Sequence, residues 1–282
     1  MWPDVPSGER GEPDDASPRA FLMALLAAFE VDVPVQLLIR ACSLFEIDEN
    51  RTRVALHRLR TKGLIDSPER GTYRVTGNAE MLGETVGWRE ALGRLRPWEG
   101  RWIGLHTAPL PRADKTVARR RDRATAFVGL RELVPGLLVR PDNLVGGVER
   151  LRDRLHRLGL EPEAAMFSLT DLGPHEEVAH TLWQELQLDQ RYEQNIAAMD
   201  DVEASLAQVS DDEGARQSFL AGNRAIQDIV LDPLLPAPLV DPELRQRFVD
   251  RMKAFDVVGR RAWARVLGTD LALRRAPAVE IR

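Results

Sequence analysis

The chain has 282 residues, with 39 Lys and Arg against 44 Asp and Glu, and 44% of its residues are hydrophobic. These values are typical of a globular protein and exclude wholesale disorder and a fibrous repeat, while a single cysteine, Cys42, excludes an internal disulfide and suits a reducing compartment. The longest apolar run, over 21–29, is less than half the ~20 residues that a membrane-spanning helix needs. We therefore expect a cytoplasmic protein of two or three domains with no membrane partner.

The first residues predict a leader followed by two helices. Residues 1–16 are acidic and rich in proline and glycine, so we expect them to be disordered. Ser17 and Pro18 suit the N-cap and first position of a helix that continues through FLMALLAAF. A second helix is predicted over 35–42, after Pro34.

A third predicted helix has one apolar and one basic face. Asp48 is placed to cap it, and Gly63 follows its end near Lys62. At 100° per residue, one sector that we expect to face the core holds Thr52, Ala55, Leu56 and Leu59. Two short strands, 64–65 and 73–76, then enclose a turn at 67–71 and predict a hairpin.

Helix, helix, turn, basic helix and hairpin in this order predict a winged helix-turn-helix DNA-binding domain over 17–80. Such a domain reads base edges with its last helix and holds phosphates with flanking cations. The expected DNA contacts are Asn50, Arg51, Arg53, Val54, His57, Arg58 and Thr61 on the helix, with Arg70 and Arg74 on the wing. A winged helix used only for protein contacts is the alternative.

After a linker over 81–100, residues 101–172 alternate between strand and helix patterns. We expect strands over 102–107, 136–139 and 164–169, with helices over 113–133 and 148–158. This β-α-β-α-β order predicts a ferredoxin-like domain.

Residues 173–270 predict a helical C-terminal domain, followed by a tail over 271–282. Helical apolar spacing occurs in TLWQELQL, VEASLAQV, ARQSFLAGNRAIQDIVL and LRQRFVDRMKAFDVVGRRAWARVL. The predicted fold class is therefore α+β.

Charge is distributed unevenly along the chain. Residues 50–62 hold five cations and no acid, and residues 94–157 hold 15 Lys and Arg against 7 Asp and Glu. Residues 161–213 hold 14 acids and one cation, Arg191. The asymmetry suggests that the first half meets an anionic partner. Solvated faces of charged helices are the simpler explanation of the acidic stretch.

Several motifs resemble those of the PaaX-type transcriptional repressors, over roughly residues 18–240. Trp98-Glu99-Gly100-Arg101-Trp102 is similar to that family's W-[DE]-G-x-W segment before its middle domain. The other matching segments are Ile47-Asp48-Glu49, Arg53, Ala55-Leu56, Arg58-Leu59, Lys62-Gly63-Leu64-Ile65, Leu130-Arg131, Pro135-Gly136-Leu137-Leu138-Val139-Arg140-Pro141 and Asp232-Pro233-Leu234-Leu235-Pro236.

The resemblance implies a dimeric repressor of aromatic catabolism genes, phenylacetate catabolism among them, that an aryl-CoA thioester releases from its operator. The expected partners are double-stranded operator DNA with an inverted repeat, a second copy of the chain and an aryl- or acyl-CoA effector, without a cofactor. Under this interpretation the C-terminal domain contributes the effector pocket and the dimer interface.

Candidate effector residues follow from the same interpretation. Arg119, Arg120, Arg121 and Arg123 can hold CoA phosphates, although a solvated basic face or a DNA flank explains them equally well. Aromatic candidates for an aryl pocket are Trp183, Phe219, Phe255 and Trp263, for which ordinary core packing is the alternative.

Signals for an enzyme are weak. The family's middle domain is similar to the Cas2 nuclease fold, whose metal needs a carboxylate at the end of the first strand, but here that strand ends in His106-Thr107-Ala108 with no acid before Asp114. His175 and His180 are five residues apart, off the register of a zinc-binding HExxH helix. We therefore predict no catalytic or metal-binding residue. A nucleic-acid-processing enzyme that uses the winged helix as a substrate clamp, and an interaction scaffold, remain as alternatives.

Overall fold

The computed structural model describes residues 18–29, 32–76, 87–111 and 113–269. The predicted leader, the Ser17 cap and the predicted tail lie outside these residues. The chain is a mixed α+β protein that divides into two compact units. The first unit consists of Met1–Arg89, Asn195–Val230 and Asp250–Arg282, and the second of Glu90–Gln194 and Leu231–Val249.

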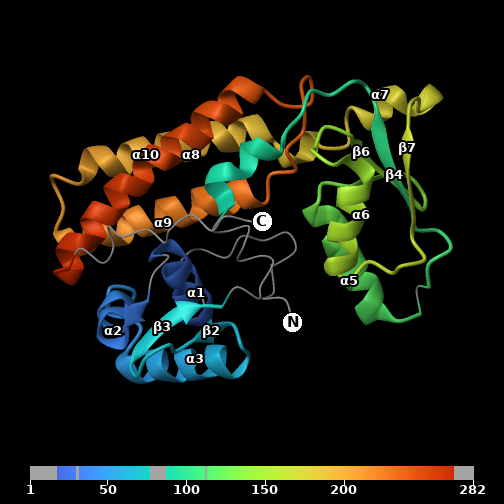
Figure 1. Cartoon of the computed structure of the whole chain (residues 1–282). Coiled ribbons are helices and arrows are strands. Elements are labelled where there is room, and N and C mark those ends of the chain that lie inside the picture. Colours follow the sequence, from blue (N-terminus) through green and yellow to red (C-terminus); the bar gives the residue numbers. More distant parts are fainter. Residues whose placement is uncertain (1–17, 30–31, 77–86, 112, 270–282) are drawn as a thin grey trace. The chain divides into compact units, whose positions relative to one another are not determined.

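The N-terminal part of the first unit contains three helices and a small sheet. Asp48 caps the third helix, because its Oδ1 accepts a hydrogen bond from the backbone N–H of Arg51 at 2.8 Å, as predicted. Figure 1 shows the three helices around the short strands. The elements are α1 (Pro18–Phe29), β1 (Val33–Pro34), α2 (Val35–Ser43), α3 (Glu49–Thr61), β2 (Ile65–Asp66) and β3 (Thr72–Val75).

The hairpin strands belong to a three-stranded antiparallel sheet in the order β1-β3-β2. Strand β1 was not expected from the sequence. It pairs Val33 with Tyr73, and its two residues are too few to produce an alternating pattern. The pairing ties the segment before α2 to the hairpin.

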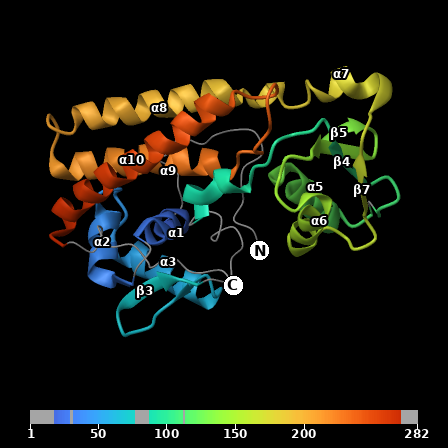
Figure 2. The same ribbon diagram turned by 45° about the horizontal axis from the view of Figure 1, so that its top comes forward.

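Helix α9 (Asp211–Val230) and the end of α10 (Pro242–Leu267) share the core of these N-terminal helices. The ring of Phe219 lies 5.0 Å from that of Phe21 and 6.1 Å from that of Trp263, measured between centroids. In both views α9 runs beside α10 (Figure 1 and Figure 2). Each unit thus combines segments far apart in sequence, whereas the domain limits that we predicted follow sequence order and remain predictions.

The second unit is built on a four-stranded antiparallel sheet in the order β5-β6-β4-β7. Helices α5 and α6 pack along one side of this sheet (Figure 1 and Figure 2). The elements are β4 (Trp102–His106), α5 (Lys115–Phe127), β5 (Arg131–Val134), β6 (Leu137–Pro141), α6 (Gly147–Arg157) and β7 (Ala165–Leu169).

The predicted helix over 113–133 is wrong in its last third. Helix α5 ends at Phe127, and Gly129 follows with φ +79°, a left-handed conformation that ends a helix readily. The next residues, Arg131–Val134, form β5, which pairs with β6 across the turn at Gly136. The order is therefore βαββαβ and not the predicted βαβαβ. This strand was not predicted, because a segment of four residues directly after a helical pattern is too short to show an alternation of its own.

The remaining elements connect the sheet to the long helices. TLWQELQL is not the predicted helix, because residues 181–183 form turns, Gln184–Leu186 form a single 3-10 turn, and Gln187, with φ +46°, separates this turn from the helix that starts at Leu188. These elements are η2 (Gly87–Arg94), η3 (Gly173–His175), α7 (Glu176–Ala179), η4 (Gln184–Leu186) and α8 (Leu188–Ser205). Within the described residues, none of the helices is both long enough and apolar enough to span a bilayer.

Candidate functional site

Helix α3 has a buried face and a polar, basic face, as predicted. Thr52, Ala55, Leu56 and Leu59 are all at most 4% exposed and anchor the helix to α1 and α2. All seven helix residues predicted as DNA contacts are exposed: Asn50, Arg51, Arg53, Val54, His57, Arg58 and Thr61. Arg60 and Lys62 are exposed as well, so the five cations of this stretch all reach solvent.

One apolar residue interrupts this polar face. Val54 is 43% exposed, although a buried site would be worth roughly 1.5–3 kcal/mol to a valine side chain. This face therefore presents one apolar side chain among polar and cationic neighbours.

Local ion pairs modify the predicted contacts. Arg53 contacts Glu49 one turn earlier, with Nη2 to Oε1 at 2.7 Å, and both side chains are at least half exposed. Such a surface pair is worth about 0–1 kcal/mol and opens readily when a phosphate or base edge competes. Arg74 lies 3.7 Å from Asp66 and 4.0 Å from Asp32, while Arg70 is exposed near the hairpin turn. Arg70 is thus the better placed of the two wing residues for a phosphate contact.

The predicted effector residues are not all available. Arg121 is 4% exposed, and its guanidinium forms an ion pair with Glu161 at 2.6 Å and lies against the carbonyl of Pro111. This internal pairing removes Arg121 from the CoA hypothesis. Its neighbours Arg119, Arg120 and Arg123 are exposed on α5.

The aromatic candidates divide between the two units. Trp183 belongs to the second unit, where its Nε1 donates to the carbonyl of Gly129 at 3.0 Å and its ring stacks on Trp102. Phe219, Phe255 and Trp263 belong to the first unit and line one pocket there.

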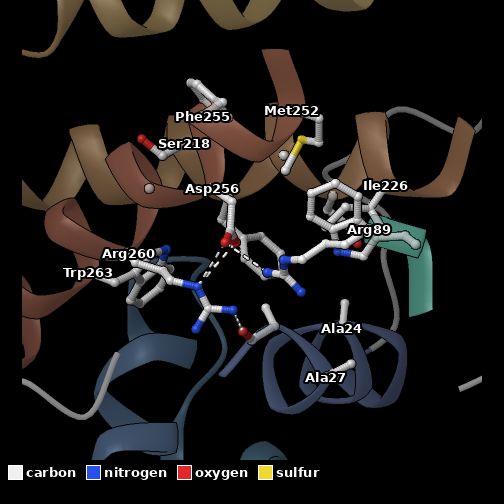
Figure 3. Close-up of a pocket in the computed structure, with 16 residues that line it drawn as sticks. Ala24, Ala27, Arg89, Ser218, Ile226, Met252, Phe255, Asp256, Arg260 and Trp263 are labelled. Carbon is white, nitrogen blue, oxygen red and sulfur yellow. Dashed lines mark hydrogen bonds and ion pairs between the residues drawn. The ribbon is translucent and has the colours of Figure 1, made fainter. Parts of the chain in front are cut away.

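That pocket has a volume of about 70 Å³, is partly open to solvent and has walls from α1, η2, α9 and α10. Figure 3 shows the two guanidinium groups of Arg89 and Arg260 directed toward the carboxylate of Asp256, at 2.7 Å and 3.1 Å. Arg260 also donates to the carbonyl of Ala28 near the end of α1, at 2.7 Å. Three aromatic walls of the pocket, Phe219, Phe255 and Trp263, were candidates from the sequence, whereas Arg89, Asp256 and Arg260 were not. The sequence feature that could have indicated the pocket is a set of small lining residues. Three are at positions i, i+3 and i+4 of α1, and the others are on α9 and α10: Ala24, Ala27, Ala28, Gly222 and Gly259.

A buried polar network in the second unit accounts for two of the family-like motifs. Arg140 is 1% exposed and donates to the carbonyls of Pro141, Val128 and Pro233 and to the side chain of Asn143. Burial, with the nearby charge of Arg154, lowers the pKa of Arg140 to about 10, against the opposing effects of Asp142 and Asp232, so the group is charged at neutral pH.

The other half of this network lies in the DPLLP segment. Asp232 accepts a hydrogen bond from the Tyr192 hydroxyl at 2.6 Å and faces Arg245 at 3.5 Å, and Arg245 in turn donates to the carbonyl of Leu235. These contacts fasten residues 232–236 to α8 and α10, and the bonds from Arg140 to the carbonyl of Pro233 and from Asn143 to the carbonyl of Leu234 fasten them to the end of β6. Most residues of the two motifs are buried, so the motifs hold the fold together.

The W-E-G-R-W segment is likewise structural. Gly100 has φ +76°, and the turn brings the Trp98 ring edge-on to Trp102 at 5.2 Å between centroids. Nε1 of Trp98 donates to the carbonyl of Arg101, and Nε1 of Trp102 donates to Glu176.

The residues weighed for a nuclease have other roles. Strand β4 ends at His106, and Asp114 caps α5 by accepting hydrogen bonds from the backbone N–H groups of Thr116 and Val117. His180 lies 3.8 Å from Glu176 and contacts the rings of Trp98 and Trp102.

Comparisons with known proteins show the fold alone. The chain is similar in structure to the uncharacterized protein Rv0674 from Mycobacterium tuberculosis, with a TM-score of 0.59 and 22% identity over 89% of this chain and 98% of that chain. No protein-family model and no curated protein sequence matches the chain.

Proposed function

We propose that the chain is a DNA-binding transcriptional regulator whose N-terminal helices and hairpin form a winged helix-turn-helix domain. The observation that carries the proposal is the exposed surface of α3 and its C-cap Lys62, where five cations, Val54 and three further polar side chains surround a fully buried face. Helices of this composition insert into the major groove, and hairpins beside them contact the backbone.

The second unit supports the proposal through its topology. Its βαββαβ order with antiparallel neighbours β7-β4-β6-β5 is the arrangement of a ferredoxin-like domain, which we propose for this unit. That fold hosts many functions, so it restricts the proposal less than α3 does.

The finer features of the proposal rest on the resemblance to PaaX-type repressors. They comprise a homodimer on an inverted repeat, repression of a catabolic operon and release by an aryl- or acyl-CoA thioester. Two recognition helices on two half-sites explain how small modules reach useful affinity. For the phosphates of a thioester, Arg119, Arg120 and Arg123 remain candidates because they are exposed.

The first experiment is footprinting of the full-length protein on the DNA upstream of its own gene. A regulator of this kind protects a short inverted repeat and binds it at least a hundredfold more tightly than random DNA of equal length. Equal affinity for both DNAs would refute sequence-specific recognition.

Substitutions on α3 test the proposed recognition face. Arg53→Ala and His57→Ala should each reduce affinity for the protected site more than affinity for random DNA, by about 1–3 kcal/mol for a bidentate arginine contact. Arg247→Ala is the matched control, because Arg247 is an exposed cation of α10 in the second unit and is not among the predicted DNA contacts. Equal losses of affinity for both DNAs would indicate that Arg53 and His57 contact phosphates and not bases.

Substitutions on the wing test backbone contacts through salt dependence. Arg70→Ala should reduce the slope of log affinity against log salt by about 0.9, the value for one lost phosphate contact. Arg74→Ala should have a smaller effect because Asp66 and Asp32 already lie beside its guanidinium. An unchanged slope for the double variant would show that the wing does not touch DNA.

A further inference from the structure

The pocket of the first unit combines charge with apolar walls. Two guanidinium groups, those of Arg89 and Arg260, and one carboxylate, that of Asp256, lie among its lining residues (Figure 3). Arg260 is 7% exposed, and the side chains of Arg89 and Asp256 are 19% and 11% exposed. Charged groups removed from water in this way interact strongly with an ion that enters beside them.

The pocket also holds a buried hydroxyl. Ser218 is 3% exposed, and its Oγ has no hydrogen-bond partner among the described residues. A buried hydroxyl without a partner is costly in a folded protein, and a ligand with an acceptor oxygen satisfies it. Figure 3 shows this hydroxyl apart from the guanidinium groups of Arg89 and Arg260, so it is a second polar position of the same pocket.

The remaining walls are apolar and the space is small. Trp88, Met252, Phe255 and Trp263 are each at most 4% exposed and contribute aromatic and thioether surface. The pocket is partly open to solvent, and its volume of about 70 Å³ is about half of the ~150 Å³ that accommodates a benzene ring in a protein core. The pocket therefore suits a carboxylate with a short aliphatic chain and is far too small to enclose a CoA thioester.

We propose that this pocket binds a short-chain organic carboxylate of two to four carbons. Its carboxylate pairs with the guanidinium groups of Arg89 and Arg260, because a guanidinium can donate two parallel hydrogen bonds to a carboxylate. The hydrocarbon end lies against the aromatic walls.

The same site is connected to the DNA-binding helices. Arg260 donates to the carbonyl of Ala28, in the last turn of α1, where helix carbonyls lack partners within the helix. Helix α1 packs on α3 through the shared core. A carboxylate that binds Arg260 competes with its hydrogen bond to Ala28. Since this bond holds α1, which packs on α3, the ligand and the DNA should each change the affinity of the protein for the other. This coupling rests on the proposed function, whereas binding of the carboxylate does not.

A calorimetric titration of the full-length protein with propionate tests the site. Propionamide is the matched control, because it has nearly the same shape without the charge, and we expect it to bind at least tenfold more weakly. Benzoate should also bind at least tenfold more weakly, because its ring is larger than the volume between the aromatic walls. Equal binding of propionate and propionamide, or tighter binding of benzoate, would overturn the assignment.

A variant that fills the pocket without breaking its ion pairs locates the site. Methyl groups added at Gly222 and Gly259 would lie 3.6 Å or more from the nearest side chains, and both residues are helical, where alanine is favoured over glycine. Gly222→Ala/Gly259→Ala should therefore fold, with a thermal midpoint no lower than that of the wild type, and bind propionate at least tenfold more weakly. Gly93→Ala, at a position with open space around it, is the control and should bind as the wild type does. Unchanged binding in the double variant would place the ligand elsewhere.

The coupling is measured in both directions. Saturating propionate should change the affinity for the protected DNA site at least fivefold, and the DNA should change the affinity for propionate by the same factor. If propionate binds but no DNA is recognised, the proposed function fails and the carboxylate site stands. If specific DNA binding is found and propionate does not bind, the carboxylate site fails alone.

Discussion

Replacing Arg140 by methionine should destabilise the second unit more than any surface change. The side chain is 1% exposed and donates to three carbonyls and one amide oxygen. Methionine keeps much of the volume and removes every donor, so these oxygens lose a partner that water does not replace in a buried site.

The magnitude follows from the groups left behind. A buried acceptor without a partner costs about 1–3 kcal/mol, and removal of one member of a buried charged network costs about 3–5 kcal/mol. Part of this loss is recovered, because burial of the charged guanidinium itself costs free energy, as its pKa, lowered to about 10, shows. We expect a net loss of about 3–5 kcal/mol.

The assay is urea denaturation followed by circular dichroism, with Arg123→Met as the control, because Arg123 is exposed on α5. A surface change of that kind alters stability by about 0.5 kcal/mol or less. A chain with two compact units can unfold in two steps, and the loss should then appear in one of them. If Arg140→Met is as stable as Arg123→Met, the network does not hold the DPLLP segment in place.

Three further predictions concern single residues. Burial, followed by the charge of Asp232, raises the pKa of Tyr192 above its ordinary 10.0, so the folded state keeps this proton after the unfolded state has lost it. The stabilising contribution is therefore complete below pH 10 and is lost as the pH rises beyond it. Tyr192→Phe should flatten the decline in the free energy of unfolding above pH 10. Burial also raises the pKa of the Cys42 thiol, so a disulfide reagent such as Ellman's should modify it only in denaturant, and rapid reaction of the native protein would contradict its burial. Leu56→Ala should cost about 2–5 kcal/mol in thermal or urea unfolding because Leu56 is 1% exposed in the core between α1 and α3, and a cost below 1 kcal/mol would contradict that packing.

The sequence by itself determined the elements whose signals are local. The cap at Asp48, the buried face of α3 and the long helices α9 and α10 all follow from residues within a few turns of each other. For the same reason, the set of exposed residues on α3 was predictable, since one buried face of a helix defines the opposite one.

Tertiary structure decided whatever depends on partners distant in the sequence. Strands β1 and β5 have two and four residues, and only their pairing with β3 and β6 makes them strands. Arg121 resembled its exposed neighbours in sequence and differs from them because Glu161, 40 residues away, lies beside it. The pocket needs α1, η2, α9 and α10 together, so no single segment of the sequence describes it. A hydrophobic pattern records which face of an element is buried, but the identity of the group that buries it is fixed only when the chain folds.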